Sequence, residues 1–85
     1  MHDDENYRYI SNGKVIDLSL YENFILKELI ERKGKPIKYE ELCKKMYKDM
    51  PRKPYDAITT IMHRLRKKLK GEVEIKTKNQ IGFYI

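Results

Sequence analysis

The segment 57–70, AITTIMHRLRKKLK, combines hydroxyl, imidazole and cationic side chains at helical spacing. On a helix of about 3.6 residues per turn, one side would be apolar and would carry Ile58, Met62, Leu65 and Leu69. The opposite side would carry Thr60, His63, Arg64 and Lys67, flanked by Thr59, Arg66 and Lys68. Such a helix can rest on a core while its polar face enters the major groove of B-DNA, where Arg reads guanine and cations attract phosphates. The segment is therefore predicted to be a recognition helix.

The first part of the chain is expected to form a hairpin ahead of the first helix. Residues 1–6, MHDDEN, are acidic and polar, so we expect a frayed tail there and a single domain over 7–85. The dipeptide Asn12-Gly13 strongly favours a hairpin turn. It is flanked by two β-prone runs, at 7–10 and 14–18.

Helix boundaries follow from capping residues, glycine and proline. Ser19 and Glu22 have the spacing of a capping box, which predicts that a first helix begins there. Gly34 and Pro36 predict that this helix ends before them. After this helix we predict a very short strand at 36–38, a helix at 39–48 and a loop with two prolines at 50–54. A further helix is predicted at 57–70, with Asp56 as its N-cap and Gly71 as its C-terminal stop. Strands are predicted at 73–77 and 83–85.

Three helices followed by a β-hairpin form the winged helix-turn-helix plan, an α+β fold. In this plan the third helix enters the major groove, and the hairpin, called the wing, lies over the neighbouring backbone or minor groove. The chain has 85 residues, which is enough for one small domain but not for a core that encloses a deep substrate cavity.

Charge is spread unevenly along the chain. Residues 1–31 contain three basic and seven acidic side chains, a net charge of −4, whereas residues 32–85 contain sixteen basic and six acidic side chains, a net charge of +10. A basic half of this density predicts a polyanionic partner. The alternative is a lysine-rich surface that is merely well solvated.

The sequence lacks the residues that several classes of function require. No apolar run approaches the roughly 18 residues of a membrane span, and no signal-peptide pattern opens the chain, so a cytoplasmic protein with no membrane partner is expected. Cys43, His2 and His63 are too scattered for a structural metal site, and no cofactor motif is present. An enzyme is not expected, because the chain offers no nucleophile-base-acid set and no phosphate-binding glycine loop.

The chain also carries a spaced set of short motifs. They are Asn12-Gly13-Lys14 through Leu18-Ser19, Glu22 with Ile25-Leu26 and Leu29, Gly34-Lys35-Pro36-Ile37, Glu40-Glu41-Leu42, IMHRLRKKL at 61–69, Ile75-Lys76-Thr77, and Gly82-Phe83. With these motifs the chain resembles the DNA-binding domain of OmpR/PhoB-type transcriptional regulators over residues 12–85. Two departures stand out: Asn23 takes a position that is usually aromatic, and the N-terminal sheet is predicted to be one hairpin instead of four strands. With no receiver domain ahead of it, we expect either a small stand-alone regulator or a fragment of a larger one.

The resemblance and the helical spacing together assign roles to single residues. The candidates for contacts with base edges are Thr59, Thr60, His63 and Arg64. Among them Arg64 is the best single candidate, because a guanidinium pairs in bidentate fashion with guanine. The candidates for phosphate contacts are Arg66, Lys67, Lys68 and Lys70, and the wing candidates for backbone or minor-groove contacts are Thr77, Lys78 and Asn79.

The resemblance implies that the partner is double-stranded DNA and that the protein regulates transcription. One small domain contacts few base pairs, so paired binding with dimerisation on DNA is expected. Loop 49–55 lies where the family contacts RNA polymerase; with Arg52 and Lys53 it could equally touch DNA, or be a simple connection. The alternative function is a protein-interaction winged helix that docks on RNA polymerase or another regulator.

Overall fold

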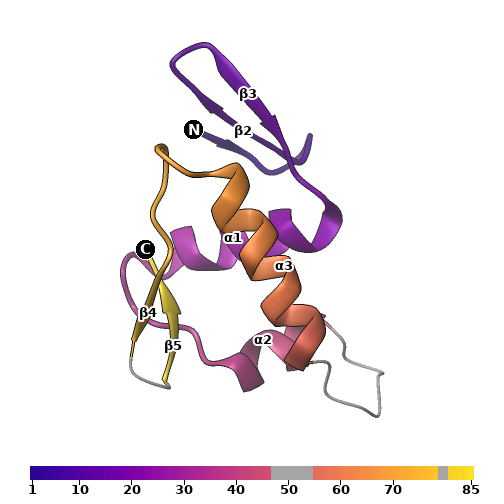
Figure 1. Ribbon diagram of the computed structural model, residues 1–85, viewed down its shortest axis with the longest axis vertical. Coiled ribbons are helices and arrows are strands. Elements are labelled where there is room, and N and C mark those ends of the chain that lie inside the picture. The colour runs from indigo at the N-terminus through magenta and orange to yellow at the C-terminus, as the bar shows by residue number, and fades with distance from the viewer. Residues whose placement is uncertain (47–54, 79–80) are drawn as a thin grey trace.

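The computed structural model describes residues 1–46, 55–78 and 81–85. An antiparallel sheet comes first, with strands β1 (His2–Asp3), β2 (Arg8–Ser11) and β3 (Lys14–Asp17) in that order. The helices α1 (Leu20–Glu31), α2 (Tyr39–Met46) and α3 (Tyr55–Lys68) follow, and a hairpin of β4 (Lys76–Lys78) and β5 (Gly82–Tyr84) completes the domain (Figure 1). This is the predicted α+β winged helix, with α3 crossing in front of α1 in this view.

The expectation of a frayed tail over residues 1–6 is wrong, because β1 pairs with β2 and makes the first sheet three-stranded instead of a hairpin. Polar contacts hold this segment in place. Asn23 is 3% exposed, donates to the carboxylate of Asp4 at 2.7 Å, and lies 2.6 Å from Nε2 of His2. Arg8 donates to the Asp3 carboxylate at 3.0 Å. Asn23 and Arg8 thus both anchor the first strand.

The capping box at the start of α1 is confirmed. The backbone N–H of Glu22 donates to the Ser19 hydroxyl at 3.3 Å, and the backbone N–H of Ser19 donates to the Glu22 carboxylate at 2.8 Å. The predicted hairpin turn is confirmed as well, since Asn12 and Gly13 have φ values of 49° and 79°. Both the capping box and the turn are therefore determined by residues close together in the sequence.

The other predicted boundaries shift by a few residues. α3 begins at Tyr55, so Asp56 lies in its first turn and is not the N-cap. The predicted end of the second helix at 47–48 lies outside the described residues. β4 is shorter than the predicted strand 73–77, because the backbone N–H groups of Glu72 and Val73 donate to Leu69 O and close the end of α3 instead of joining the sheet.

The core lies where the three helices meet the wing. Its fully buried side chains come from every helix, from the link between α1 and α2, and from the turn after α3: Ile25, Leu26, Leu29, Ile37, Leu42, Ile58, Met62, Leu65 and Leu69. Phe83 of β5 joins them at 2% exposure and contacts the Tyr39 ring edge to face, with centroids 4.7 Å apart. Ile37 pairs with Phe83 in an isolated bridge, so the very short strand predicted at 36–38 is reduced to a single paired residue.

None of the helices in the described parts of the chain is both long enough and apolar enough to cross a membrane.

Candidate nucleic-acid interface

α3 separates apolar from polar side chains as its spacing predicts. The inward side chains of α3 and of the turn after it are at most 1% exposed, and they are Ile58, Met62, Leu65 and Leu69. The outward side chains are exposed, and they are Thr59, Thr60, His63, Arg64 and Lys67. Because the core contacts hold the inward face, the outward face is presented on a fixed support. All four candidates for base contacts lie on it.

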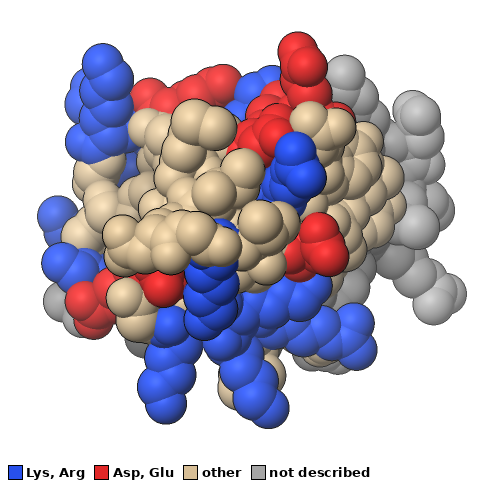
Figure 2. All heavy atoms as spheres, turned by 90° about the horizontal axis from the view of Figure 1, so that it is seen from above, with Lys and Arg blue, Asp and Glu red and all other residues tan. Residues whose placement is uncertain are grey.

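Three cations at or near this face have no hydrogen-bond or ion-pair partner among the described residues. Arg64, Lys67 and Lys70 form no hydrogen bond or ion pair with any residue in the described ranges. Figure 2 shows a group of Lys and Arg side chains projecting together from the lower edge of the molecule, which is the side that faces the viewer in Figure 1, where α3 lies. Unpaired cations gathered on one face attract a polyanion.

The surface beside α3 is hollowed. A hollow of about 350 Å³ lies between the start of α1 and the outward face of α3, and it is lined by Ser19, Glu22, Arg64, Lys67 and Lys68. Two of its cations, Arg64 and Lys67, are the free ones. The hollow is therefore lined by two cations without a partner among the described residues and by one ion pair, that of Glu22 and Lys68.

This pair joins Glu22, whose side chain is 3% exposed, to Lys68, whose side chain is 40% exposed. Lys68 Nζ donates to Glu22 Oε1 at 2.6 Å and to the backbone carbonyl of Asp17 at 3.2 Å. Burial by itself raises the pKa of Glu22, but the hydrogen bonds from Lys68 and Ser19 outweigh it and leave the pKa below its usual value. The structure thus ties Lys68, a predicted phosphate contact, to α1 and β3. The capping pattern identified Glu22, but no local signal indicated its second partner.

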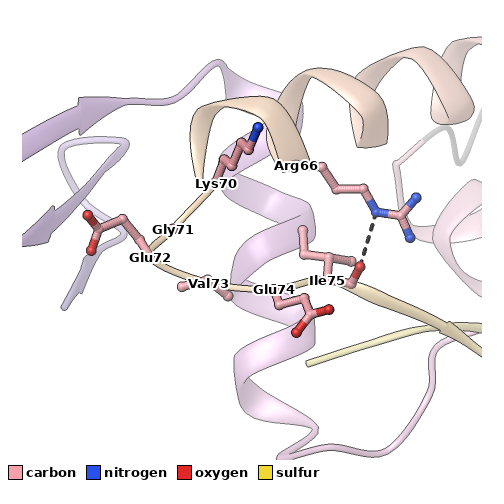
Figure 3. Close-up of a pocket in the computed structure, with 7 residues that line it drawn as sticks. All are labelled: Arg66, Lys70, Gly71, Glu72, Val73, Glu74 and Ile75. Carbon is pink, nitrogen blue, oxygen red and sulfur yellow. Dashed lines mark hydrogen bonds between the residues drawn. The ribbon is translucent and has the colours of Figure 1, made fainter.

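Arg66 is also held within the protein. Its Nε donates to the backbone carbonyl of Ile75 at 3.1 Å, and its Nη2 donates to the hydroxyl of Thr77 at 2.6 Å. Its guanidinium carbon lies 5.4 Å from the centroid of the Phe83 ring. Figure 3 shows Arg66 directed at Ile75 along the edge of an open hollow of about 480 Å³ that Lys70 and Glu72 also line. Two of the four predicted phosphate contacts, Arg66 and Lys68, therefore have partners within the fold.

The wing presents a short exposed strand. Lys76, Thr77 and Lys78 of β4 are all exposed, and Lys76 Nζ lies 5.8 Å from the centroid of the Tyr84 ring. Asn79 lies outside the described residues, as do residues 49–54 of the predicted polymerase-contacting loop. Lys76 was not among the predicted contacts, although a cation in an exposed strand next to Thr77 is a signal the sequence contains.

Comparison with known families identifies the domain. The family model described as transcriptional regulatory protein, C terminal, matches residues 13–85. The sensory transduction protein BceR of Bacillus subtilis (strain 168) is 39% identical over 83 residues, which cover 96% of this chain and 33% of BceR. The chain thus spans about a third of the length of this curated relative.

Two solved structures share the arrangement. The C-terminal domain of the nisin resistance regulator NsrR, a lantibiotic response regulator, is 27% identical, with a TM-score of 0.80 over 94% of this chain and 84% of that one. The Klebsiella pneumoniae RstA DNA-binding domain, solved in complex with the RstA box, is 24% identical and shares the fold, with a TM-score of 0.82 over 99% of this chain and 87% of that one. The match to the family model over most of the chain, with these shared folds, shows that the chain belongs to the transcriptional regulatory protein C-terminal family, the OmpR/PhoB-type winged helix-turn-helix domains.

Proposed function

We propose that this domain binds double-stranded DNA in a sequence-specific manner and regulates transcription, with α3 in the major groove and the wing on the backbone or minor groove. The observation that carries the proposal is the outward face of α3. There Thr60, His63 and Arg64 lie exposed beside the unpaired cation Lys67, on a helix whose other face is buried. The RstA DNA-binding domain, which has the same fold, was solved in complex with the RstA box.

Within this proposal the residues divide by what they can recognise. Thr59, Thr60, His63 and Arg64 contact base edges, and Arg64 reads a guanine through its two forked N–H donors. Lys67 and Lys70, which have no partner among the described residues, contact phosphates. Lys78 and Asn79 contact the backbone or minor groove from the wing. Two copies bind on repeated half-sites, because one helix spans few base pairs.

The test is selection from a random duplex library, followed by affinity measurements against salt. We expect an enriched motif with a direct or inverted repeat, and a log K that falls linearly with log salt by about 0.9 per phosphate contact. Arg64→Ala should relax the preference at one base pair, at a cost of about 1–3 kcal/mol. Lys14→Ala is the matched control, because it removes an exposed cation beside the first hairpin turn and should leave the preference unchanged.

The other outcomes separate the alternatives. Salt-sensitive binding without a motif would indicate an architectural factor or one recruited by polymerase. No binding at low salt would overturn the proposal in favour of a winged helix that docks on RNA polymerase or another regulator.

A further inference from the structure

We infer that Arg66 is a positioning residue that holds the wing in place relative to α3, and that it does not contact a phosphate. The inference rests on the proposed function, because it concerns how the DNA-binding surface is assembled. In sequence Arg66 stands between two outward cations, Arg64 and Lys67, and looks like a third. In the structure its side chain turns toward the wing (Figure 3).

The two strands of the wing are attached to the rest of the domain in different ways. β5 is attached through Phe83, whose backbone N–H and carbonyl both bond to Ile37, at 3.0 and 2.8 Å, and whose ring is buried. β4 pairs with β5 along its whole length, but its own three residues 76–78 are all exposed. Burial within the strand therefore positions β5, whereas β4 is held through its pairing with β5 and through the buried Ile75 just before it.

Arg66 adds a direct polar attachment between α3 and β4. One of its hydrogen bonds ends on the carbonyl of Ile75, immediately before β4, and the other on the hydroxyl of Thr77, the middle residue of β4. Two bonds from one planar group to two points on a strand fix its direction as well as its distance. Through the Phe83 ring the same guanidinium also contacts β5. α3 and both strands of the wing are thus joined at one side chain.

Only arginine has the geometry for this attachment. Its guanidinium carries donors in a rigid planar fork and stacks on aromatic rings, whereas the lysine ammonium is a point charge on a flexible stem. A phosphate contact would not require arginine, because both arginine and lysine bind phosphates. Replacement of Arg66 by lysine therefore distinguishes positioning from phosphate binding.

The experiment compares Arg66→Lys, Arg66→Ala and Lys67→Ala in affinity for the selected duplex. Positioning predicts that both Arg66 variants lose affinity about fivefold to tenfold, as expected from one to two lost hydrogen bonds, although Arg66→Lys keeps the charge. Lys67→Ala removes an adjacent unpaired cation and is the matched control for charge. Wild-type affinity in Arg66→Lys would overturn the inference.

A second pair of variants tests the route through Thr77 without a change of charge. Thr77→Val removes the hydroxyl that Arg66 donates to, while Thr77→Ser keeps it. We expect Thr77→Val to add no further loss in the Arg66→Ala background, because both changes break the same contact. Additive losses would overturn the inference.

Amide spectra and hydrogen exchange of the free protein provide the readout that needs no DNA. In both Arg66 variants the amides of residues 76–78 should shift and exchange faster, while Lys67→Ala leaves them unchanged. Unchanged wing amides in Arg66→Ala would overturn the inference even if affinity fell. If the wild-type protein bound no duplex, the proposed function would fail, while these spectra would still show whether Arg66 holds the wing.

Discussion

At the scale of single residues, Glu22 shows how a buried charge is stabilised. Its side chain is 3% exposed, and its carboxylate accepts from the Ser19 backbone N–H and from Lys68 Nζ. Since these bonds hold its pKa below the usual value of 4.5, the folded protein binds this proton less readily than the unfolded chain does. The resulting stabilisation is fully present above pH 4.5 and is lost as the pH falls through the lower pKa of the folded state.

Glu22→Gln should lower the free energy of unfolding at pH 7 by about 1–3 kcal/mol, because a hydrogen bond between two charged groups is replaced by a weaker one. The stability of the variant should also fall less than that of the wild type as the pH drops below 4.5. Urea unfolding followed by circular dichroism over this pH range measures both effects. Glu31→Gln is the control, because Glu31 is exposed at the end of α1. Parallel stability curves for wild type and Glu22→Gln would contradict the explanation.

The sequence predicted those residue features that depend on near neighbours. Spacing along one helix identified the buried Ile58, Met62 and Leu65, and the capping pattern identified Ser19 and Glu22. The sequence could not distinguish Arg66 and Lys68, which have partners within the fold, from the cations that have none among the described residues. The partners of Lys68 are in β3 and α1, and those of Arg66 are in and beside the wing, so only the folded chain brings them within reach.

At the scale of elements, the wing is attached at its second strand by a close approach of two backbones. A Cβ added at Gly82 would lie 2.0 Å from the carbonyl oxygen of Ile37, closer than any real contact. Glycine is therefore required there because the strand bonded to Ile37 leaves no room for a side chain. The place of the wing in the domain depends on this one position as well as on Arg66.

Gly82→Ala should lower the free energy of unfolding by about 1–3 kcal/mol, because β5 must move away from Ile37 to make room. The amide of Phe83, which donates to Ile37 O, should lose protection from hydrogen exchange. Gly71→Asn is the control for backbone strain without a steric clash, since Gly71 has a φ of 87° but open space around it. Thermal unfolding with amide exchange measures both variants, and an Ala variant as stable as the control would contradict the steric argument.

Elements whose signals are local were predicted well, and those held by distant contacts were not. The order of helices and the Asn12-Gly13 turn followed from periodicity and turn chemistry. β1 was missed because an acidic segment has no strand pattern, and its place depends on Asn23 in α1. The start of β4 was misplaced because backbone groups at 72–73 close the end of α3, a choice that residue preferences do not reveal.

At the scale of the whole molecule, the formal net charge of +6 matters less than where the charge lies. Lys14 stands beside the hairpin turn of β2 and β3, which lies at one end of the long axis, whereas Lys67 belongs to α3 (Figure 1). Both side chains are exposed. In the proposed complex only Lys67 faces DNA, so equal changes of net charge at the two positions should have unequal effects.

Lys67→Glu should slow association with the selected duplex by about tenfold or more at low salt, whereas Lys14→Glu should change it by less than about twofold. Both variants change the net charge by the same amount, so the comparison isolates position. Stopped-flow anisotropy with a labelled duplex at two salt concentrations measures the rates, and the difference should shrink as salt rises. Equal slowing by the two variants would show that net charge alone governs the encounter.

The bridge between Ile37 and Phe83 also has a consequence for how the chain is made. Ile37 is fully buried in the finished domain, yet its strand partner is translated only after all three helices. At roughly 5–20 residues per second, Phe83 is synthesised about one to three seconds after the last residue of α3. Until Phe83 is in place, the apolar faces of the helices are incompletely buried, and they remain accessible to chaperones and to one another. The core of the domain is therefore complete only when β5 has joined it.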